Sequence, residues 1–492
     1  MSDTAVIALV MIVYLVVVAV IGLVSTKLIK GQDDFLLAGR KLGPFMVLAG
    51  LTATHIGGGS VMGVSEESFI WGYSGMAYSV GTAIGLVLLG LLSARKLRAM
   101  SLRTITDYLA IRYNSRVVRG LCAGLSIVAV TGIVAAQVNA AGGALAILGI
   151  DPTMGALVAV SLFIAYTFFA GMWGVALTDA VQVTIVVIGV PIASIAGFVA
   201  VGGFTGLQEF AQSSPDISSS VFFSPVGMGT MAMLGIITPV VMYDLIGQDF
   251  YQRLFSARSA KVARGSAIGA GLLLLLFAVF PILGGMSSRA LFGELEDTSS
   301  ALPTLIVEVL PIGLAAVVVS AILAAVMSTA DSLLIAGSTH ITNDFYQKIM
   351  GRDPEGKSKR TLVVARVWTL ILGVGALLFA LSVPGIIQVL ALAYTMYASG
   401  VFVPVIGGLL WRRANTSGAI AAIIAGSLFG LSGAFGLIDY GSVPDVVVGG
   451  LGSLVAFVVV SLLTKPTEMK SHGETSEESV AASDVSDRPS GA

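Results

Sequence analysis

Charge is scarce in this sequence. Only 11% of its 492 residues are Asp, Glu, Lys or Arg, while 56% are hydrophobic, and its mean hydropathy is +0.95. Ordinary soluble domains contain about 25% charged residues. The chain therefore has too little polar surface to enclose a water-soluble core, and its composition predicts an all-α polytopic membrane protein.

Several other features are missing as well. A single cysteine, Cys122, excludes a disulfide within the chain. No Lys or Arg precedes Lys27, so the N-terminus lacks the basic start of a signal peptide, and the first apolar run is expected to stay in the membrane. The loops contain no paired His/Asp metal motif or nucleophile elbow, no repeated pore-loop pattern is visible, and the polar tail is too short for a kinase domain. These absences argue against an enzyme, a channel or a signalling receptor.

The apolar residues fall into thirteen runs that can each cross the membrane as a helix, which takes about 20 residues. The runs lie at 5–25, 45–71, 74–95, 119–148, 153–171, 175–202, 228–249, 264–287, 311–336, 361–382, 384–411, 416–436 and 443–464. Residues 1–464 are thus expected to form one transmembrane domain. The tail 465–492 is polar and lacks aromatic residues, so it is expected to be disordered.

The basic residues of the loops lie on one side of these spans. With the N-terminus outside, the inner loops 26–44, 96–118, 250–263 and 337–360 are rich in Lys and Arg, whereas the outer loops contain Arg289 alone. Inner loops are usually the more basic ones in membrane proteins. The sequence therefore predicts a cell-membrane protein with an outside N-terminus and a cytoplasmic C-terminus.

Two of the predicted helices contain residues that interrupt a helix. The second contains "ATHIGGGSV" (53–61), where each of the three consecutive glycines costs roughly 1 kcal/mol relative to alanine. The seventh contains Pro239, followed by polar residues, in "TPVVMYDLIGQD" (238–249). Two interrupted helices in matching places indicate inverted repeats, here 45–202 and 228–411, with a binding site near the midplane. Gly and Pro are, however, also common in membrane helices generally.

Three acidic residues lie inside predicted spans. Asp179, Asp244 and Asp331 each cost at least ~2.5 kcal/mol at the centre of a membrane helix, so each is a candidate functional residue. No Lys or Arg is expected deep enough in the membrane to neutralise them. Acids without basic partners suggest that a mobile cation supplies the missing charge.

The helix 311–336 carries small and hydroxyl residues on one face, at i, i+3, i+4 and i+7: Ala325, Ser328, Thr329 and Ser332. Hydroxyl oxygens suit a hard cation such as Na⁺. A helix break at 55–60 would add freed carbonyl oxygens, including those of Ala53 and Ile56. The same hydroxyls could instead bond the carbonyl one turn earlier or a neighbouring helix.

Four motifs recur together in one known family: "LTATHIGGG" (51–59), "AGMWGVALTDAVQ" (170–182), "GQDFYQR" (247–253) and "AAVMSTADSLL" (324–334). With them the chain resembles the solute:sodium symporter family, which includes proline, pantothenate, choline, sialic acid and sugar transporters. The resemblance extends over about 5–464. It implies thirteen transmembrane helices with a leucine-transporter-type five-plus-five inverted repeat, and Na⁺-coupled symport of a small organic solute into the cell.

The resemblance also assigns ion ligands, position by position. It implies a main Na⁺ site formed by the carbonyls of Ala53, Ile56 and Ala325 and the hydroxyls of Ser328 and Thr329. Some members have a second ion site, which would use Asp179 and Ser332 here. Asp331 stands where such members can have a serine, and this extra acid could bind an ion, a proton or a structural partner.

The resemblance implies that the solute lies between the two broken helices and helices 3, 4 and 11. The candidates by position are His55, Gly58, Gly59, Ser60, Gln137, Asp244, Gln248 and Tyr397. Sialic acid transporters use an arginine on helix 4 to bind a carboxylate, and residues 132–137 contain no basic residue. Choline transporters bind the quaternary ammonium in an aromatic cage, and His55 and Gly247 stand at positions that resemble those of two tryptophans of that cage. The expected substrate is a small amino acid such as proline, a carboxylate or a vitamin-like solute, with choline or a sugar as the alternative.

Two further interpretations remain open at the residues themselves. A symporter of the same fold could use H⁺, with Asp179, Asp331 or His55 as the carrier. His55 and Asp244 could also serve only in hydrogen bonds between helices.

Overall fold

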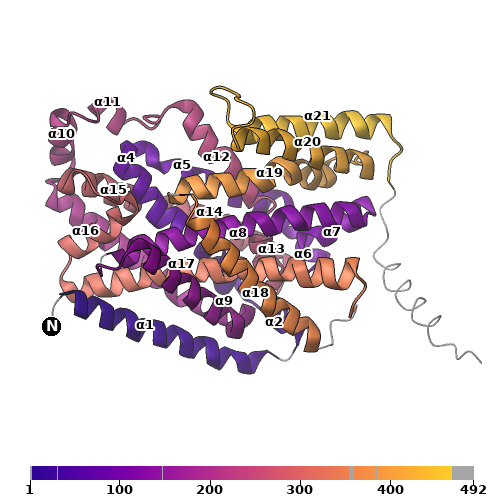
Figure 1. Ribbon diagram of the computed structural model, residues 1–492, viewed down its shortest axis with the longest axis horizontal. Helices are drawn as coiled ribbons and strands as arrows, with labels where there is room; N and C mark the ends of the chain where they lie inside the picture. The colour runs from indigo at the N-terminus through magenta and orange to yellow at the C-terminus, as the bar shows by residue number, and fades with distance from the viewer. Residues whose placement is uncertain (1–2, 30, 147, 354–358, 384, 468–492) are drawn as a thin grey trace, which may run out of the picture.

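The computed structural model describes residues 3–29, 31–146, 148–353, 359–383 and 385–467, and this part of the chain is built from helices without a β-strand. The expected disordered tail lies outside the described residues from 468 onward. Figure 1 shows the long helices side by side, with α10 (Gly203–Ser213) and the N-terminus at one end and α6 (Arg95–Ala99) and α7 (Ile105–Tyr113) towards the other. The second end also carries the Lys- and Arg-rich loops and is named the basic end below.

The long helices cross from one end to the other. In chain order they are α1 (Asp3–Ser25), α3 (Pro44–His55) with α4 (Val64–Trp71), α5 (Ala77–Leu89), α8 (Arg116–Ala146), α9 (Pro152–Ala200), α12 (Thr230–Asp244) with α13 (Gln248–Ser256), α14 (Ala260–Phe277) with α15 (Val279–Phe292), α17 (Ile312–Thr339), α18 (Lys359–Ala380), α19 (Ile386–Leu410), α20 (Thr416–Ala434) and α21 (Asp445–Leu463).

The predicted all-α membrane architecture is confirmed. Eleven helical segments of the described residues are at least 18 residues long and apolar enough to cross a membrane. Of the thirteen predicted spans, two are not among these eleven segments, because one is interrupted and the other is shorter. The span 45–71 is divided into α3 and α4, and the span 153–171 is the first part of α9, which bends at Gly171, where φ is +57°.

The break between α3 and α4 falls within the glycine run. The amide of Gly57 donates to the carbonyl of His55 at 2.8 Å, whereas a continuing α-helix would direct it to the carbonyl of Ala53. The chain then forms the π-helical segment η3 (Gly58–Gly63) before α4 begins. The break therefore releases the Ala53 carbonyl, as the sequence predicts.

The second break lies further along the chain than its proline suggests. Pro239 is inside α12, and the helix ends at Asp244. The amides of Ile246 and Gly247 both donate to the carbonyl of Tyr243, at 2.9 Å and 2.6 Å, and α13 begins at Gln248. This helical pair extends to Ser256, so the predicted span 228–249 is about two turns too short.

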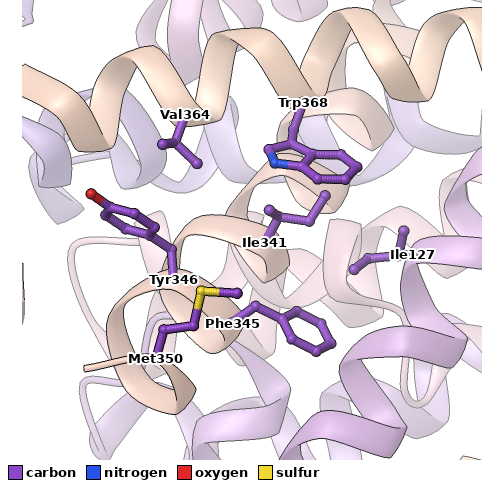
Figure 2. Close-up of a pocket in the computed structure, with 7 residues that line it drawn as sticks. All are labelled: Ile127, Ile341, Phe345, Tyr346, Met350, Val364 and Trp368. Carbon is purple, nitrogen blue, oxygen red and sulfur yellow. The ribbon is translucent and has the colours of Figure 1, made fainter. Parts of the chain in front are cut away.

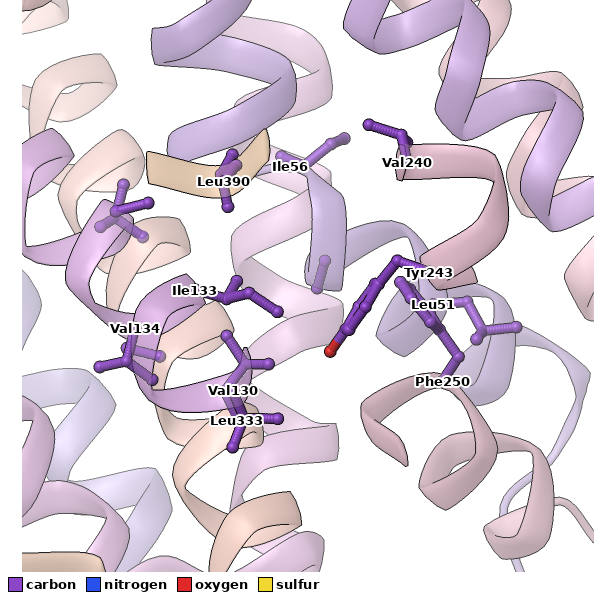
Figure 3. Close-up of a cluster of buried hydrophobic side chains, with 14 of the residues drawn as sticks. Leu51, Ile56, Val130, Ile133, Val134, Val240, Tyr243, Phe250, Leu333 and Leu390 are labelled. Atoms are coloured by element: carbon purple, nitrogen blue, oxygen red, sulfur yellow. The ribbon is translucent and has the colours of Figure 1, made fainter. Parts of the chain in front are cut away.

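The helix α17 lies at the centre of the bundle. Of its apolar window, 78% is buried, against 22% for α1, and it packs against α1, α3, α8, α9 and α18. Figure 3 shows Leu333 of α17 beside Val130 and Ile133 of α8, with Tyr243 and Phe250 across from them. Because α17 is enclosed on all sides, its polar side chains must pair with protein groups or with an ion.

A buried ionic cluster joins three helices at the basic end. Arg119 of α8 donates to Oδ1 of Asp107 and to Oδ1 of Asp344, at 2.7 Å each. Nδ1 of His340 lies 2.8 Å from Oδ2 of Asp344. His340 and Asp344 belong to η7 (His340–Ile349), the π-helical continuation of α17. The cluster thus ties α7 and α8 to the end of the central helix.

The helix α7 begins directly after its N-cap residue, Thr104. The Thr104 hydroxyl accepts a hydrogen bond from the Asp107 amide and Asp107 accepts one from the Thr104 amide, which is a capping box. Burial raises the pKa of Asp107, but the Arg119 guanidinium and the amides of Arg103 and Thr104 outweigh burial and hold the pKa below its ordinary value.

At the opposite end of the bundle, two adjacent acids of α4 accept hydrogen bonds from uncharged donors. Glu66 accepts hydrogen bonds from the hydroxyl of Thr298, at 3.2 Å, and from the amide of Ile386, at 3.3 Å. Glu67 accepts one from Gln388 at 3.0 Å. The second half of the broken helix is therefore attached to the start of α19.

We predict that Arg119→Gln lowers the free energy of unfolding by about 3 kcal/mol or more, because two buried carboxylates lose their shared cation. Thermal or denaturant unfolding of the purified protein measures this, with exposed Arg95→Gln as the control. Since the pKa of Asp107 is lowered in the folded state, its contribution is present at neutral pH and is lost only as the pH falls below about 4. Unchanged stability of Arg119→Gln would contradict this role of the cluster.

Candidate ion and solute site

The broken end of α3 meets the hydroxyl face of α17. The Thr329 hydroxyl donates to the released carbonyl of Ala53 at 2.9 Å and lies 3.1 Å from the carbonyl oxygen of Ala325. Ile56 directly follows α3 and has a non-helical ψ of 66°. The structure therefore brings oxygen atoms of two helices together where the main Na⁺ site was predicted.

Gly57 keeps a space among these oxygens. A Cβ atom at this position would lie 2.6 Å from the Thr329 hydroxyl, 3.3 Å from the Ala325 carbonyl oxygen and 3.1 Å from Oε1 of Gln137. Carbonyl and hydroxyl oxygens are suitable ligands for a hard cation, so the residues present fit Na⁺. Of the three consecutive glycines, only Gly58 and Gly59 were predicted from the sequence as site residues, and Gly57 was not.

A buried ion pair lies beside this site. The Ser328 hydroxyl donates to Oδ1 of Asp179. Nη2 of Arg253 donates to Oδ2 of Asp179 at 2.9 Å and to the Ser332 hydroxyl at 2.5 Å. Both charged side chains are at most 2% exposed. The expectation that no basic residue reaches the intramembrane acids is therefore wrong for Asp179.

Arg253 was expected in the loop 250–263, because a charged residue at a span end usually marks a loop. The chain instead continues after the second break as α13, which is buried along its whole length. Gly50 of α3 leaves room for the guanidinium, since a Cβ there would lie 2.9 Å from Nε of Arg253. The apolar residues on both sides of Arg253, Phe250 and Tyr251 before it and Leu254 and Phe255 after it, are the signal that could have indicated a buried helix.

Asp331 points to a different neighbour. Its Oδ1 accepts a hydrogen bond from the hydroxyl of Thr167 in the first part of α9 at 2.7 Å, and its Oδ2 has no hydrogen-bond partner among the described residues. Of the three residues predicted for a second ion site, Asp179 and Ser332 are therefore connected through Arg253, whereas Asp331 bonds Thr167 instead.

His55 and Asp244 meet between the two broken helices. Nε2 of His55 lies 3.2 Å from Oδ1 of Asp244, and Nδ1 of His55 lies 3.2 Å from the Tyr78 hydroxyl. The Tyr78 hydroxyl is 3.1 Å from that of Tyr394, and the ring of Phe250 stacks on His55 at 5.0 Å. The sequence analysis missed the three aromatic residues, because nothing in their spacing distinguishes them from packing residues.

The residues of the glycine run are closely packed. Oε1 of Gln137 accepts the Gly58 amide at 2.9 Å. A Cβ at Gly58 would lie 2.9 Å from the same oxygen, and a Cβ at Gly59 would lie 2.5 Å from the Tyr78 hydroxyl. The volume beside both glycines is thus filled by Gln137 and Tyr78. The Ser60 hydroxyl is buried and has no hydrogen-bond partner within the described part of the chain.

Two other predicted solute residues form hydrogen bonds to the backbone. Gln248 accepts the amide of Ile105 at 2.9 Å and donates to the carbonyl of Arg103 at 3.2 Å, so it attaches α13 to α7 at the basic end. The Tyr397 hydroxyl donates to the carbonyl of Ile246 at 3.3 Å and supports the second break.

Taken together, the geometry defines a class of protein. Two broken helices face one another at the middle of an all-helical bundle, oxygen atoms cluster at one break, and a buried acid lies at the other. This is the arrangement of ion-coupled secondary transporters.

The chain belongs to the sodium:solute symporter family, whose family model matches residues 35–426. It is 26% identical to the osmoregulated proline transporter OpuE of Bacillus subtilis (strain 168), over 92% of this chain and 94% of the relative. It is 26% identical to the sodium/proline symporter of Escherichia coli (strain K12), over 92% of each chain. It is also 26% identical to the high-affinity choline transporter 1 of Caenorhabditis elegans, over 82% of this chain and 71% of the relative.

Solved structures show the same fold. A Na⁺-coupled sialic acid symporter in a substrate-bound outward-open state aligns with a TM-score of 0.80 at 20% identity, over 94% of this chain and 99% of that chain. The nucleobase-cation-symport-1 family transporter MHP1, in a closed conformation, aligns with a TM-score of 0.56 at 15% identity, over 90% and 98%. At these identities the likeness concerns the fold alone.

Family membership settles the class of function. The protein is a multi-pass membrane protein that couples Na⁺ to the symport of a small organic solute, and it is not an enzyme. The family, the fold and the coupling ion expected from the sequence are confirmed, and none of these comparisons favours H⁺ as the coupling ion.

We predict that Gly57→Ala raises the Na⁺ concentration needed for half-maximal transport by about tenfold or more, because the new methyl group displaces the oxygens that surround the site. Gly124→Ala is the matched control, since a Cβ there meets nothing within 4 Å. Transport in proteoliposomes at varied Na⁺ measures the shift. Wild-type Na⁺ dependence of Gly57→Ala would mean that the ion binds elsewhere.

We predict that Asp179→Asn and Arg253→Gln each destabilise the fold by about 3 kcal/mol, and that the double variant loses clearly less than the sum. Unfolding of the four proteins in Na⁺ and in K⁺ measures this double-mutant cycle. If Na⁺ but not K⁺ restored the stability of Arg253→Gln, Asp179 would be able to bind Na⁺, and Arg253 would occupy the position of that ion in the wild-type protein.

Proposed function

We propose that the protein carries a small zwitterionic solute of the amino acid type into the cell, bound between the breaks α3–α4 and α12–α13. The observation that carries this proposal is the buried side chain of Asp244. It is 0% exposed, its Oδ1 lies 3.2 Å from Nε2 of His55, and its Oδ2 has no hydrogen-bond partner among the described residues. A buried carboxylate needs donors, and a cationic amine of the solute supplies them.

The other end of such a solute fits the first break. The second half of the broken helix begins at η3, and a helix N-terminus favours a negative group. Gln137 already occupies the Gly58 amide, while the Ser60 hydroxyl is buried without a partner among the described residues. A solute carboxylate would bind the Ser60 hydroxyl and the amides that follow Gly58.

The aromatic residues around His55 limit the size of the solute. Tyr243 stacks on Tyr394 at 4.4 Å, and Tyr78 and Phe250 contact His55. A second candidate function follows from these rings, because aromatic faces also bind a quaternary ammonium. One relative is described as a choline transporter, so a choline-like cation is the alternative substrate.

For the ion we propose one Na⁺ site, formed by the carbonyls of Ala53, Ile56 and Ala325 and the hydroxyls of Ser328 and Thr329. The hydrogen bond from Ser328 to Asp179 directs the hydroxyl proton away and leaves its lone pairs for the ion. Arg253 neutralises Asp179, so no second Na⁺ is needed there. Inward movement of one Na⁺ supplies about 2.3 kcal/mol per 100 mV to the transport.

Ion and solute affinity should be coupled through α3. Ala53 provides a carbonyl to the ion site, and His55, two residues later, contacts Asp244. A ligand that fixes the end of α3 at one site therefore also fixes the residues of the other site, so each ligand should raise the affinity of the protein for the other.

The orientation is proposed from charge. The basic end, with the loops 26–44 and 96–118, faces the cytoplasm, and the N-terminus faces outside. The two breaks, at equivalent places of 45–202 and 228–411, support the inverted repeats.

We predict that zwitterionic amino acids, proline among them, raise the melting temperature of the purified protein in Na⁺ but not in K⁺. The panel includes choline, an amine without a carboxylate, a carboxylate without an amine, and a sugar. Asp244→Asn should lose this response and keep Na⁺ binding, whereas Asp439→Asn, in an exposed loop, should behave as wild type. Stabilisation by choline with none by amino acids would select the alternative, and an undiminished response of Asp244→Asn would overturn the site.

A further inference from the structure

An apolar pocket of about 350 Å³ lies between α8, η7 and α18, apart from the ion and solute site. Figure 2 shows Trp368 and Val364 of α18 above it, with Phe345 of η7 and Met350, directly after η7, below and Ile127 of α8 to one side. All seven residues that line it are apolar or aromatic. Water gains few hydrogen-bond partners in such a pocket, so an apolar occupant is favoured.

The pocket opens at the surface of the bundle, since Met350 and Trp368, which line it, are 64% and 37% exposed. Val363 and Val367 of α18 are 58% and 47% exposed, and Val117 and Val128 of α8 are 57% and 47% exposed. In a membrane-spanning bundle such exposed apolar faces contact acyl chains. Val364 and Trp368 lie about 8 and about 14 Å along α18 from its first residue, at 1.5 Å per residue.

Two arginines, Arg116 and Arg352, belong to segments that adjoin the pocket at the basic end. The amide of Arg352 donates to the carbonyl of Tyr346, which lines the pocket, at 3.1 Å. A Cβ at Gly120 would lie 3.4 Å from Ile349, so the first turns of α8, with Arg116, pack at the end of η7. Arg116 and Arg352 are both exposed. The acid nearest in sequence, Asp353, accepts a hydrogen bond from Thr361.

The geometry points to a binding site for an anionic phospholipid of the leaflet at the basic end, with an acyl chain in the pocket and the headgroup phosphate at Arg116 and Arg352. Basic pockets between transmembrane helices bind anionic headgroups in this way. One wall of the site is η7, which continues α17 and holds Asp344 in the Arg119 cluster. A bound lipid therefore stabilises the central helix in the position in which the basic end is closed.

The test uses the full-length protein, delipidated in detergent and titrated with phosphatidylglycerol or phosphatidylcholine. Melting temperature and native mass spectrometry report bound lipid. Phosphatidylglycerol should bind more tightly, and Arg116→Gln and Arg352→Gln should each weaken it about fivefold, with little effect on phosphatidylcholine. Lys261→Gln, exposed at the same end, is the charge control.

A second pair of variants tests the acyl-chain pocket. Val364→Trp should fill it and remove the stabilisation by phosphatidylglycerol, while Val363→Trp, on the exposed face one residue away, should not. Equal affinity for the two lipids, or equal stabilisation by inorganic phosphate, would overturn the proposal. Dimer formation abolished by Val364→Trp would assign the face to a second copy of the chain and would also overturn it.

Discussion

At the end of α3 the amide of Gly57 donates to the carbonyl of His55 at 2.8 Å instead of continuing the helix. The carbonyl of Ala53 is thereby left without its helical donor and accepts the Thr329 hydroxyl of α17. A free backbone carbonyl is costly in the apolar interior of a membrane protein, so the break is maintained only because another helix or an ion satisfies it. The proposed ion site depends on this one redirected amide, because the amide frees the Ala53 carbonyl to bond Thr329 of α17.

Charge is the second constraint, because few charged groups reach the interior and each needs a partner. Arg253 pairs with Asp179 beside the ion site, and Arg119 pairs with Asp344 where α17 passes into η7. Both acids are 0% exposed, and a buried ion is tolerated only with a close counter-ion. The central helix is therefore bound near its middle through the Ser328 and Ser332 hydroxyls, which contact the Arg253–Asp179 pair, and at the basic end through Asp344.

Hydrogen bonds join the helices at both ends of the bundle, on either side of the proposed solute site. Glu66 and Glu67 attach α4 to α19 at one end, and Gln248 attaches α13 to α7 at the other. Tyr78 and Gln137 fill the volume beside Gly58 and Gly59. Entry of a solute requires one of these end contacts to open and these side chains to move, as alternating access around a central site demands.

Local properties of the chain determined a large part of this description. Span length, scarce charge and basic loops predicted the helices and the basic end, and the helical repeat placed Ala325, Ser328, Thr329 and Ser332 on one face. The glycine run predicted the first break, and the released carbonyl of Ala53 followed from it. Tertiary structure alone decided that Arg253 pairs with Asp179, that Gly57 lies beside Thr329 and Gln137, and that Gln248 bonds the backbone of Arg103 and Ile105. These contacts join residues on different helices, and their partners depend on how each helix is rotated and tilted by packing, which the periodicity of a single helix does not contain.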